Sequence, residues 1–311
     1  MKNKLTYIKL LLVVFSVYLA EAAVCAQTLP SLLMNQDAAV LAKGSAGVVS
    51  EAGAYSLQNN VAAMALTEDR MAAQAGFAIW QPSYANLKTI GFGAMYRVIE
   101  KLAFGVDFQY LTMPSYDAVS GNGITIRDGK FTPKEYNVAL GSSYAILDCL
   151  SAGATLRLAG SALSPEAEAT VFGVDLGVMF KMNGIKAGVS VNNLGTKVKY
   201  GETAYPQPAM LKVGAGYALE FGKSSIGIDA EADILFAKGL MVGAGCEYSF
   251  DRLVFVRAGY HYGNSANVIP SHASVGLGFK VFGVTLDAAY LIAGGDSPMK
   301  NTMCFGLGYR F

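Results

Sequence analysis

The chain closes with "MCFGLGYRF", residues 303–311, and this stretch decides the class of fold. Its odd-numbered positions carry Met, Phe, Leu, Tyr and Phe, whereas its even-numbered positions carry Cys, Gly, Gly and Arg. Successive side chains of a β-strand point to opposite faces, so the stretch predicts a strand with one apolar face and one face of small and charged residues. Aromatic residues at the end of such an apolar face are typical of a strand that ends at a membrane interface.

The same alternation recurs upstream in segments of about ten residues, a pattern typical of transmembrane β-barrels. In "TIGFGAMYRV", residues 89–98, Ile, Phe, Ala, Tyr and Val occupy one face, and Thr, Gly, Gly, Met and Arg occupy the other. Residues 102–111, 225–234 and 273–281 repeat the pattern. We count about fourteen such segments, a number typical of bacterial outer-membrane barrels. They begin near residues 70, 88, 102, 134, 150, 168, 185, 209, 224, 240, 253, 271, 284 and 301.

The connections between these segments alternate in length. Tight connections such as "IEK" (99–101) and "FDR" (250–252) alternate with longer ones such as "QPSYANLK" (81–88) and residues 114–134. Outer-membrane barrels have short periplasmic turns and longer extracellular loops. This orientation, together with an even number of strands, predicts that both termini lie in the periplasm.

The composition favours an outer-membrane barrel over a soluble β-sandwich or β-propeller, whose strands would also alternate. Charged residues make up 15% and hydrophobic residues 53% of the chain, whereas soluble domains carry about 25% charged residues. A soluble monomer does not tolerate an apolar outer face of this extent. After residue 26 no apolar run reaches the ~18–20 residues of a spanning helix, and lipid admits only helices or closed barrels. The net charge of +1 gives no argument for nucleic-acid binding.

Residues 1–26 have the three parts of a secretory signal peptide. Three lysines within the first nine residues precede the apolar run "LLLVVFSVYLA" (10–20), and "AVCAQ" (23–27) supplies a small-residue cleavage site. A lipoprotein anchored at Cys25 is the less favoured alternative, because Val24 fits poorly before a lipidated cysteine. The signal peptide and the apolar strands together predict the outer membrane of a Gram-negative cell, with membrane lipid around the barrel.

Residues 27–69 lack the alternation of apolar and polar residues. We assign the barrel to residues 70–311. Residues 27–69 are rich in Ala, Gly, Ser and Asn, and we expect them to fold into the lumen as a plug or to lie under the periplasmic mouth. Lumen width grows with strand number, so a barrel of this size without an insert would leave a water-filled passage. Gln58, Asn59 and Asn60 are the candidate plug residues, with the asparagines bonded to lumen charges.

The N-terminal segment also carries a family resemblance. Residues 38–66, "AAVLAKGSAGVVSEAGAYSLQNNVAAMAL", resemble the opening of PorV/PorQ-type proteins and, more distantly, of the FadL superfamily. The small-residue stretch of those proteins corresponds to residues 44–49, and their "NPA" motif to residues 60–62, where Val61 replaces the proline. "VSVNNLG", residues 189–195, is similar to a recurrent strand end of the group.

This resemblance implies a fourteen-stranded barrel of the Bacteroidetes outer membrane. PorV-like proteins act in type IX secretion, where they carry cargo by its C-terminal domain from the translocon to a surface attachment complex. The implied partners are therefore type IX components or cargo C-terminal domains. FadL-like relatives imply the alternative, transport of hydrophobic small molecules across the outer membrane.

Charged side chains on the predicted inner face would form either a polar conduit with a ligand site or an ion-pair network that fills the lumen. Asp229, Glu231 and Asp233 place three carboxylates along one strand face, and such like charges need cationic partners. Arg257 and Lys280, on later strands, are the predicted partners. Inward glycines would leave room for packed side chains or let the strands bend.

No enzymatic activity and no cofactor are predicted. The two histidines, His261 and His272, belong to no local Ser-His-Asp motif; an outer-membrane phospholipase or protease is the enzyme alternative. The three cysteines after residue 26 are too far apart in sequence for a metal site or disulfide framework. The Gly-x-Gly pairs do not extend to the GxGxxG of a nucleotide site.

The connection over residues 114–134 is the predicted partner-contact loop. Tyr116, Ile124, Ile126 and Phe131 place apolar side chains among glycine and serine. The alternative is a mobile surface loop with no partner. A continuous apolar pocket beneath the plug would favour transport, whereas a packed polar lumen with apolar outer loops would favour protein binding.

Overall fold

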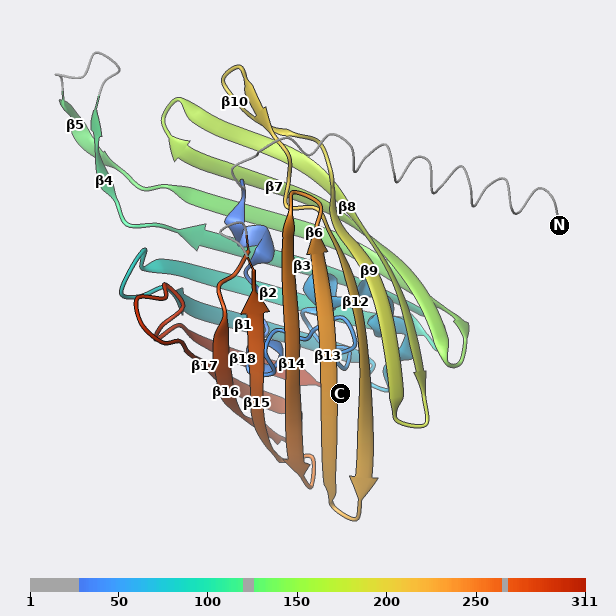
Figure 1. Cartoon of the computed structure of the whole chain (residues 1–311). Helices are drawn as coiled ribbons and strands as arrows, with labels where there is room; N and C mark the ends of the chain where they lie inside the picture. Colours follow the sequence, from blue (N-terminus) through green and yellow to red (C-terminus); the bar gives the residue numbers. More distant parts are fainter. Residues whose placement is uncertain (1–27, 120–125, 265–267) are drawn as a thin grey trace, which may run out of the picture.

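A computed structural model of the chain describes residues 28–119, 126–264 and 268–311; the predicted signal peptide over residues 1–26 lies outside the described residues. The main sheet is a closed barrel of antiparallel strands in the order β1-β18-β17-β16-β15-β14-β13-β12-β9-β8-β7-β6-β3-β2 (Figure 1). The first and last barrel strands pair with each other and close the ring. The prediction of a barrel of about fourteen antiparallel strands is therefore confirmed.

Each barrel strand begins within two residues of its predicted start. The strands are β1 (Met71–Trp80), β2 (Leu87–Ile99), β3 (Leu102–Thr112), β6 (Lys134–Leu147), β7 (Leu150–Ser164), β8 (Ala167–Met182), β9 (Ile185–Gly195), β12 (Met210–Phe221), β13 (Ser224–Leu235), β14 (Gly239–Phe250), β15 (Val254–Gly263), β16 (His272–Val281), β17 (Val284–Ile292) and β18 (Met303–Arg310).

The closing stretch has the two faces that its alternation predicts. Phe305, Leu307 and Tyr309 are exposed on the outer surface, while Cys304 and Gly306 are buried inside. The ring closure continues past the strand, because the carbonyl oxygen of the terminal phenylalanine accepts hydrogen bonds from the backbone N–H groups of residues 70 and 71. None of the helices formed by the described residues combines the length and hydropathy needed to span a bilayer.

The two ends of the barrel differ, and we call them the loop end and the turn end. All connections at the turn end are tight, such as the one between β12 and β13 at the bottom of Figure 1, whereas the loop end carries the long connections and two short ones, β7–β8 and β13–β14. The loop end carries two hairpins in connections for which no strands were predicted: β4 (Tyr116–Val119) with β5 (Ile126–Phe131), and β10 (Val198–Tyr200) with β11 (Thr203–Tyr205). Figure 1 shows β4 and β5 projecting beyond the barrel at the upper left.

Residues 28–69, the N-terminal segment, lie inside the barrel. The segment forms four short helices, η1 (Pro30–Leu33), α2 (Ala38–Leu41), α3 (Ser56–Asn59) and η2 (Val61–Leu66). Polar side chains begin two of them: Asp37 accepts hydrogen bonds from the N–H groups of the first turn of α2, and Asn60 accepts one from η2. Such caps satisfy backbone donors that would otherwise be unpaired inside the lumen.

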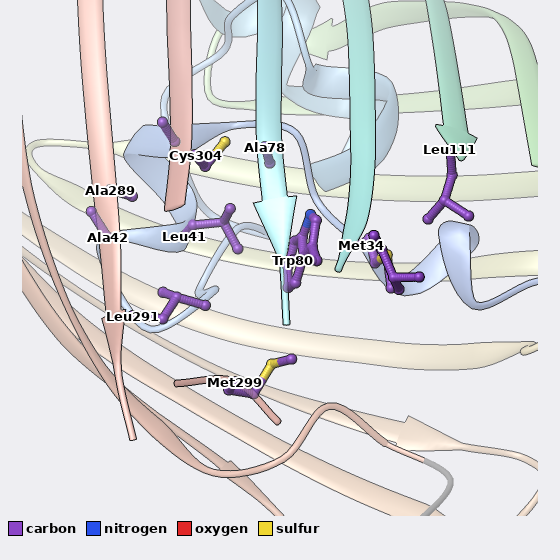
Figure 2. Close-up of a cluster of buried hydrophobic side chains, with 12 residues drawn as sticks. Met34, Leu41, Ala42, Ala78, Trp80, Leu111, Ala289, Leu291, Met299 and Cys304 are labelled. Atoms are coloured by element: carbon purple, nitrogen blue, oxygen red, sulfur yellow. The ribbon is translucent and has the colours of Figure 1, made fainter. Parts of the chain in front are cut away.

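The segment fills the lumen in three layers. At the loop end, Met34 and Leu41 pack against Trp80, Leu111 and other strand residues in an apolar layer (Figure 2). At the turn end, a second apolar layer joins η2 and α3 to the inner faces of the strands through Ala52, Leu57, Val61, Ala62, Ala63, Met64, Ala72, Met95, Ala103, Ala139 and Met179. A polar layer lies between the two apolar layers.

The two ends of the N-terminal segment lie at opposite ends of the barrel. The Thr28 hydroxyl donates to the carbonyl oxygen of Pro206 in a loop-end connection, whereas Asp69 forms an ion pair with Arg310 at the turn end. The predicted periplasmic position of the N-terminus concerns residues that lie outside the described ones. An even number of strands places the start of the first strand and the end of the last strand at the same end of the barrel. It does not place the start of the chain, because the segment that precedes β1 crosses the lumen.

Candidate functional site

The polar layer is built around a carboxylate with two cationic partners. Asp229 on β13 forms ion pairs with Lys43 of the N-terminal segment, at 2.6 Å, and with Lys186 on β9, at 2.8 Å. All three side chains are buried. Burial disfavours the charged form of Lys43, and the carboxylate of Asp229 offsets this cost. A buried charge of this kind is stable only while its partner stays in place.

The two other predicted carboxylates on β13 share a third lysine. Lys212 on β12 lies 3.4 Å from a carboxylate oxygen of Glu231 and 4.0 Å from one of Asp233. Glu231 also accepts a hydrogen bond from the backbone N–H of Val48 in the N-terminal segment. The stack of carboxylates is therefore neutralised partly by neighbouring strands and partly by the segment.

The partners predicted for these carboxylates need correction. Arg257 lies opposite Glu247 on the neighbouring strand and pairs with it and with Asp287, at 2.6 Å, rather than with the carboxylates of β13. Lys280 is half-buried near the turn end and forms no ion pair with any residue that the structure describes. Nearer lysines, on the strand adjacent to β13 and on the segment, take the place of both.

The three candidate plug residues make different contacts. Gln58 donates to both carboxylate oxygens of Asp107, at 2.9 and 3.1 Å. Asn60 donates to backbone carbonyls of the segment and of β8. Asn59 donates to Asp37, 3.2 Å away within the segment itself. The bond to a charge on the barrel wall is thus made by Gln58, whereas Asn60 holds backbone carbonyls and Asn59 bonds to side chains within the segment.

Two arginines fix the segment at positions that the sequence analysis did not single out. Arg310 on β18 pairs with Asp69 and donates to the carbonyl oxygen of Ala52, at 2.7 Å. Arg157 on β7 pairs with Asp175 and donates to the carbonyl oxygen of Leu57, at 3.2 Å. Arg157 therefore joins a carboxylate of β8 to the backbone of the segment, whereas Arg310 binds a carboxylate and a carbonyl that both belong to the segment. The several N–H donors of a guanidinium group allow both arrangements.

Inward glycines form the surface on which the segment lies. A side-chain carbon added at any of thirteen strand glycines would come closer than 3.4 Å to an atom of the segment. These are Gly76, Gly91, Gly93, Gly105, Gly141, Gly153, Gly177, Gly188, Gly214, Gly243, Gly245, Gly259 and Gly276. The glycines thus leave room for packed atoms, which was one of the two roles expected for them. The packed atoms are those of the segment.

A small cavity lies between residues 32–34, near the start of the segment, and the polar layer. Its volume is about 50 Å³, and Leu33, Asn137, Lys212, Asp233 and His261 are among its lining residues. Pockets for drug-sized ligands span about 300–1,000 Å³. This cavity is therefore too small for a bulky hydrophobic ligand.

The predicted partner-contact loop is a hairpin at the loop end. Tyr116 and Phe131 begin and end it, with their rings 5.8 Å apart, and the Tyr116 hydroxyl donates to the carbonyl oxygen of Leu163. Ile126 pairs through its backbone with Val119, and Ile124 lies outside the described residues. Two of the four predicted contact residues therefore form the base of the hairpin.

Comparison with known proteins supports this architecture. A family model described as "Type IX secretion system protein PorV" matches residues 19–238. The comparison with curated proteins gives no match. The toluene transporter TbuX of Ralstonia pickettii is similar over 89% of this chain and 98% of its own, with a TM-score of 0.63 and 14% identity.

Two further solved structures have the same fold. The toluene transporter TodX of Pseudomonas putida is similar over 89% of this chain and 97% of its own, with a TM-score of 0.58 and 14% identity. A FadL homologue of Pseudomonas aeruginosa is similar over 88% of this chain and 95% of its own, with a TM-score of 0.52 and 13% identity. At these identities the similarity shows a shared barrel fold and nothing about the ligand.

Proposed function

Because the chain belongs to the family of the type IX secretion system protein PorV, we propose that this outer-membrane barrel acts in protein export through contacts at its loop end and does not conduct solutes. The partners in this proposal are other type IX components or the C-terminal domains of secreted cargo. The family match supports the secretion system, and the filled lumen supports the mode of action.

The filled lumen is the observation that carries the proposal. Ion pairs and hydrogen bonds tie the N-terminal segment to β13 through Lys43, to β3 through Gln58, to β7 through Leu57 and to β18 through Asp69. Buried pairs are costly to break on one side only. A segment held by the buried pair of Lys43 and Asp229, by the partly buried pair of Asp69 and Arg310 and by hydrogen bonds to other strands stays in place, and the barrel is expected to be closed.

Conductance across a planar bilayer tests the closed state. The intact barrel should pass almost no steady current, and a barrel that lacks residues 28–66 should open a steady pore if it still assembles, because lumen width grows with strand number. A large steady current through the intact protein would contradict the proposal and favour a porin.

The β4–β5 hairpin is the proposed contact surface for protein partners. Tyr116 is 40% exposed at its base, and the hairpin projects from the barrel. Its base is narrow, since the hydroxyl oxygens of Ser115 and Thr132 lie 2.7 Å apart. Residues 116–131 can therefore be replaced by a two-residue Asn-Gly turn, which is compatible with such a closed base.

Isolation of the protein from native membranes tests this surface. The intact chain should bring along type IX components or cargo, and the chain with the shortened hairpin should lose them while it keeps its barrel. A matched control replaces the β10–β11 hairpin, residues 198–205, by the same turn. Isolation of the intact chain with bound hydrophobic small molecules and no protein partner would favour the transport alternative instead.

A further inference from the structure

The N-terminal segment enters the barrel at one mouth and reaches β1 at the other. Thr28, the first described residue, is bonded to Pro206 at 3.0 Å, in the connection between β11 and β12. Asp69 lies at the turn end beside Arg310, one residue before the end of the chain. The polypeptide between these two residues therefore runs through the whole height of the lumen.

The first residues of the segment make their contacts with loop-end parts of the barrel. Leu29 is 1% exposed and packs in a cluster with Val171 of β8 and Val198 of the β10–β11 hairpin. Leu33 packs against a cluster that includes Met210, the first residue of β12. These contacts come from several strands, so the loop-end position of residues 28–33 does not depend on a single bond.

The space below these residues is filled, apart from the cavity of about 50 Å³ that Leu33 lines. The loop-end apolar layer lies directly beneath η1, and the polar layer with its buried pair of Lys43 and Asp229 follows. A chain that precedes Thr28 cannot pass back to the turn end through this packed interior, because protein cores leave few voids larger than a water molecule.

We propose that, once the signal peptide is removed, the N-terminus of the mature chain is displayed at the cell surface, beside the β10–β11 hairpin. This end carries a free amino group and the start of the segment that fills the lumen. A molecule outside the cell could therefore bind the start of the segment that fills the lumen. The inference rests on the orientation of the barrel, with its long loops outside, and not on the role in secretion.

An epitope tag on the full-length chain tests this placement. A short tag is inserted between Gln27 and Thr28, with the signal peptide and its cleavage site unchanged. Gly201 and Gly222 are matched positions for the same tag, because both lie in hairpin turns, have positive φ angles and have open space around them. Gly201 lies in the loop-end β10–β11 hairpin, and Gly222 lies in the turn between β12 and β13 at the turn end.

Antibody binding is compared between intact cells and cells with a permeabilised outer membrane. On intact cells the N-terminal tag should bind antibody to the same level as the tag at Gly201, and the tag at Gly222 should stay at background until permeabilisation. An N-terminal tag that is hidden on intact cells, while the tag at Gly201 is bound, would overturn the proposal. A tag that is bound at Gly222 and hidden at Gly201 would overturn the orientation and, with it, the surface display.

Assembly is checked for each variant by the resistance of the folded barrel to SDS at room temperature. If the tag at the N-terminus blocks assembly, a single cysteine inserted at the same place is labelled with a bulky, membrane-impermeant maleimide. Labelling of that cysteine above the wild-type level on intact cells supports the proposal, and its absence overturns it. Neither result changes the outcome of the conductance and co-isolation experiments, so the two proposals can fail separately.

Discussion

Substitution of a single inward glycine tests whether the N-terminal segment is packed against the barrel wall. A side-chain carbon added at Gly259 would contact the backbone nitrogen of Gly44 and the carbonyl carbon of Lys43, and would lie 2.8 Å from the Lys43 Cα atom. These are backbone atoms and cannot move aside as a flexible side chain does. Gly227 is the matched control, because it is also an inward strand glycine and has no atom within 4 Å of the added carbon.

The expected magnitude follows from the difference between the two sites. Alanine in place of a strand glycine stabilises by roughly 0.5–1 kcal/mol through the lower entropy of the unfolded chain, and this gain is shared by Gly227→Ala and Gly259→Ala. Overpacking of a close contact costs about 1–3 kcal/mol, and only Gly259→Ala incurs it. The free energy of unfolding should therefore be lower for Gly259→Ala than for Gly227→Ala by about 1–3 kcal/mol.

Urea unfolding of the barrel in lipid vesicles measures this difference. The same two substitutions are then made in a barrel that lacks residues 28–66. Without the segment the added carbon at Gly259 meets nothing from Lys43 or Gly44, so the difference between the two variants should disappear. This comparison isolates the contact as the interaction term of a double-mutant cycle.

Two outcomes would refute the reasoning. Equal unfolding free energies for Gly259→Ala and Gly227→Ala in the full chain would mean that the segment does not lie against β15. A difference that persists after deletion of the segment would mean that the cost arises within the barrel wall. In either case the inward glycines would allow the strands to bend, which is the other role expected for them, and would not make room for the segment.

Two further sets of substitutions test the ion pairs and the lipid face. Asp229→Asn should lower the free energy of urea unfolding by about 3–5 kcal/mol, because it leaves two buried lysines unpaired; Asp251→Asn, in an exposed pair, should cost only about 0.2–1 kcal/mol. Leu277→Arg, near the middle of β16 on the outer face, should cost about 2–4 kcal/mol, and Phe279→Arg, closer to the turn end, should cost less. Lys280→Gln, on the inner face, should stay within about 0.5 kcal/mol of the wild type. Equal effects at positions 279 and 280 would contradict the register of the strand.

The strands could be predicted from the sequence because their environment repeats. Every barrel strand has lipid on one side and the lumen on the other. Because successive side chains point to opposite sides, apolar residues alternate with small or polar ones along the sequence. The closing strand shows this residue by residue, from exposed Met303 to half-buried Arg310. The loop-end hairpins were missed because β4 and β5 lie beyond the membrane, where no lipid imposes alternation.

Some partners in the lumen could also have been predicted, by counting from a turn. The turn between β12 and β13 joins Phe221 to Ser224, and a tight turn fixes the register of its hairpin. Counting back along both strands places Lys212 opposite Asp233, as the structure does. Arg257 could have been assigned in the same way, since the turn between β14 and β15 places it opposite Glu247.

The position of the segment could not be obtained by such counting. Lys43 and Asp229 are separated by 186 residues, and no turn or register relates them. What the register does predict is a smooth patch: Gly245 and Gly259 lie directly opposite each other on neighbouring strands, so two inward positions side by side lack side chains. Backbone can approach backbone closely only where both sides lack bulk, and Gly44 meets this requirement from the segment. The wall therefore indicates where a chain can lie against it, and beside that patch the buried carboxylate of Asp229, which Lys186 pairs on one oxygen, offers its second oxygen to a cation from the chain.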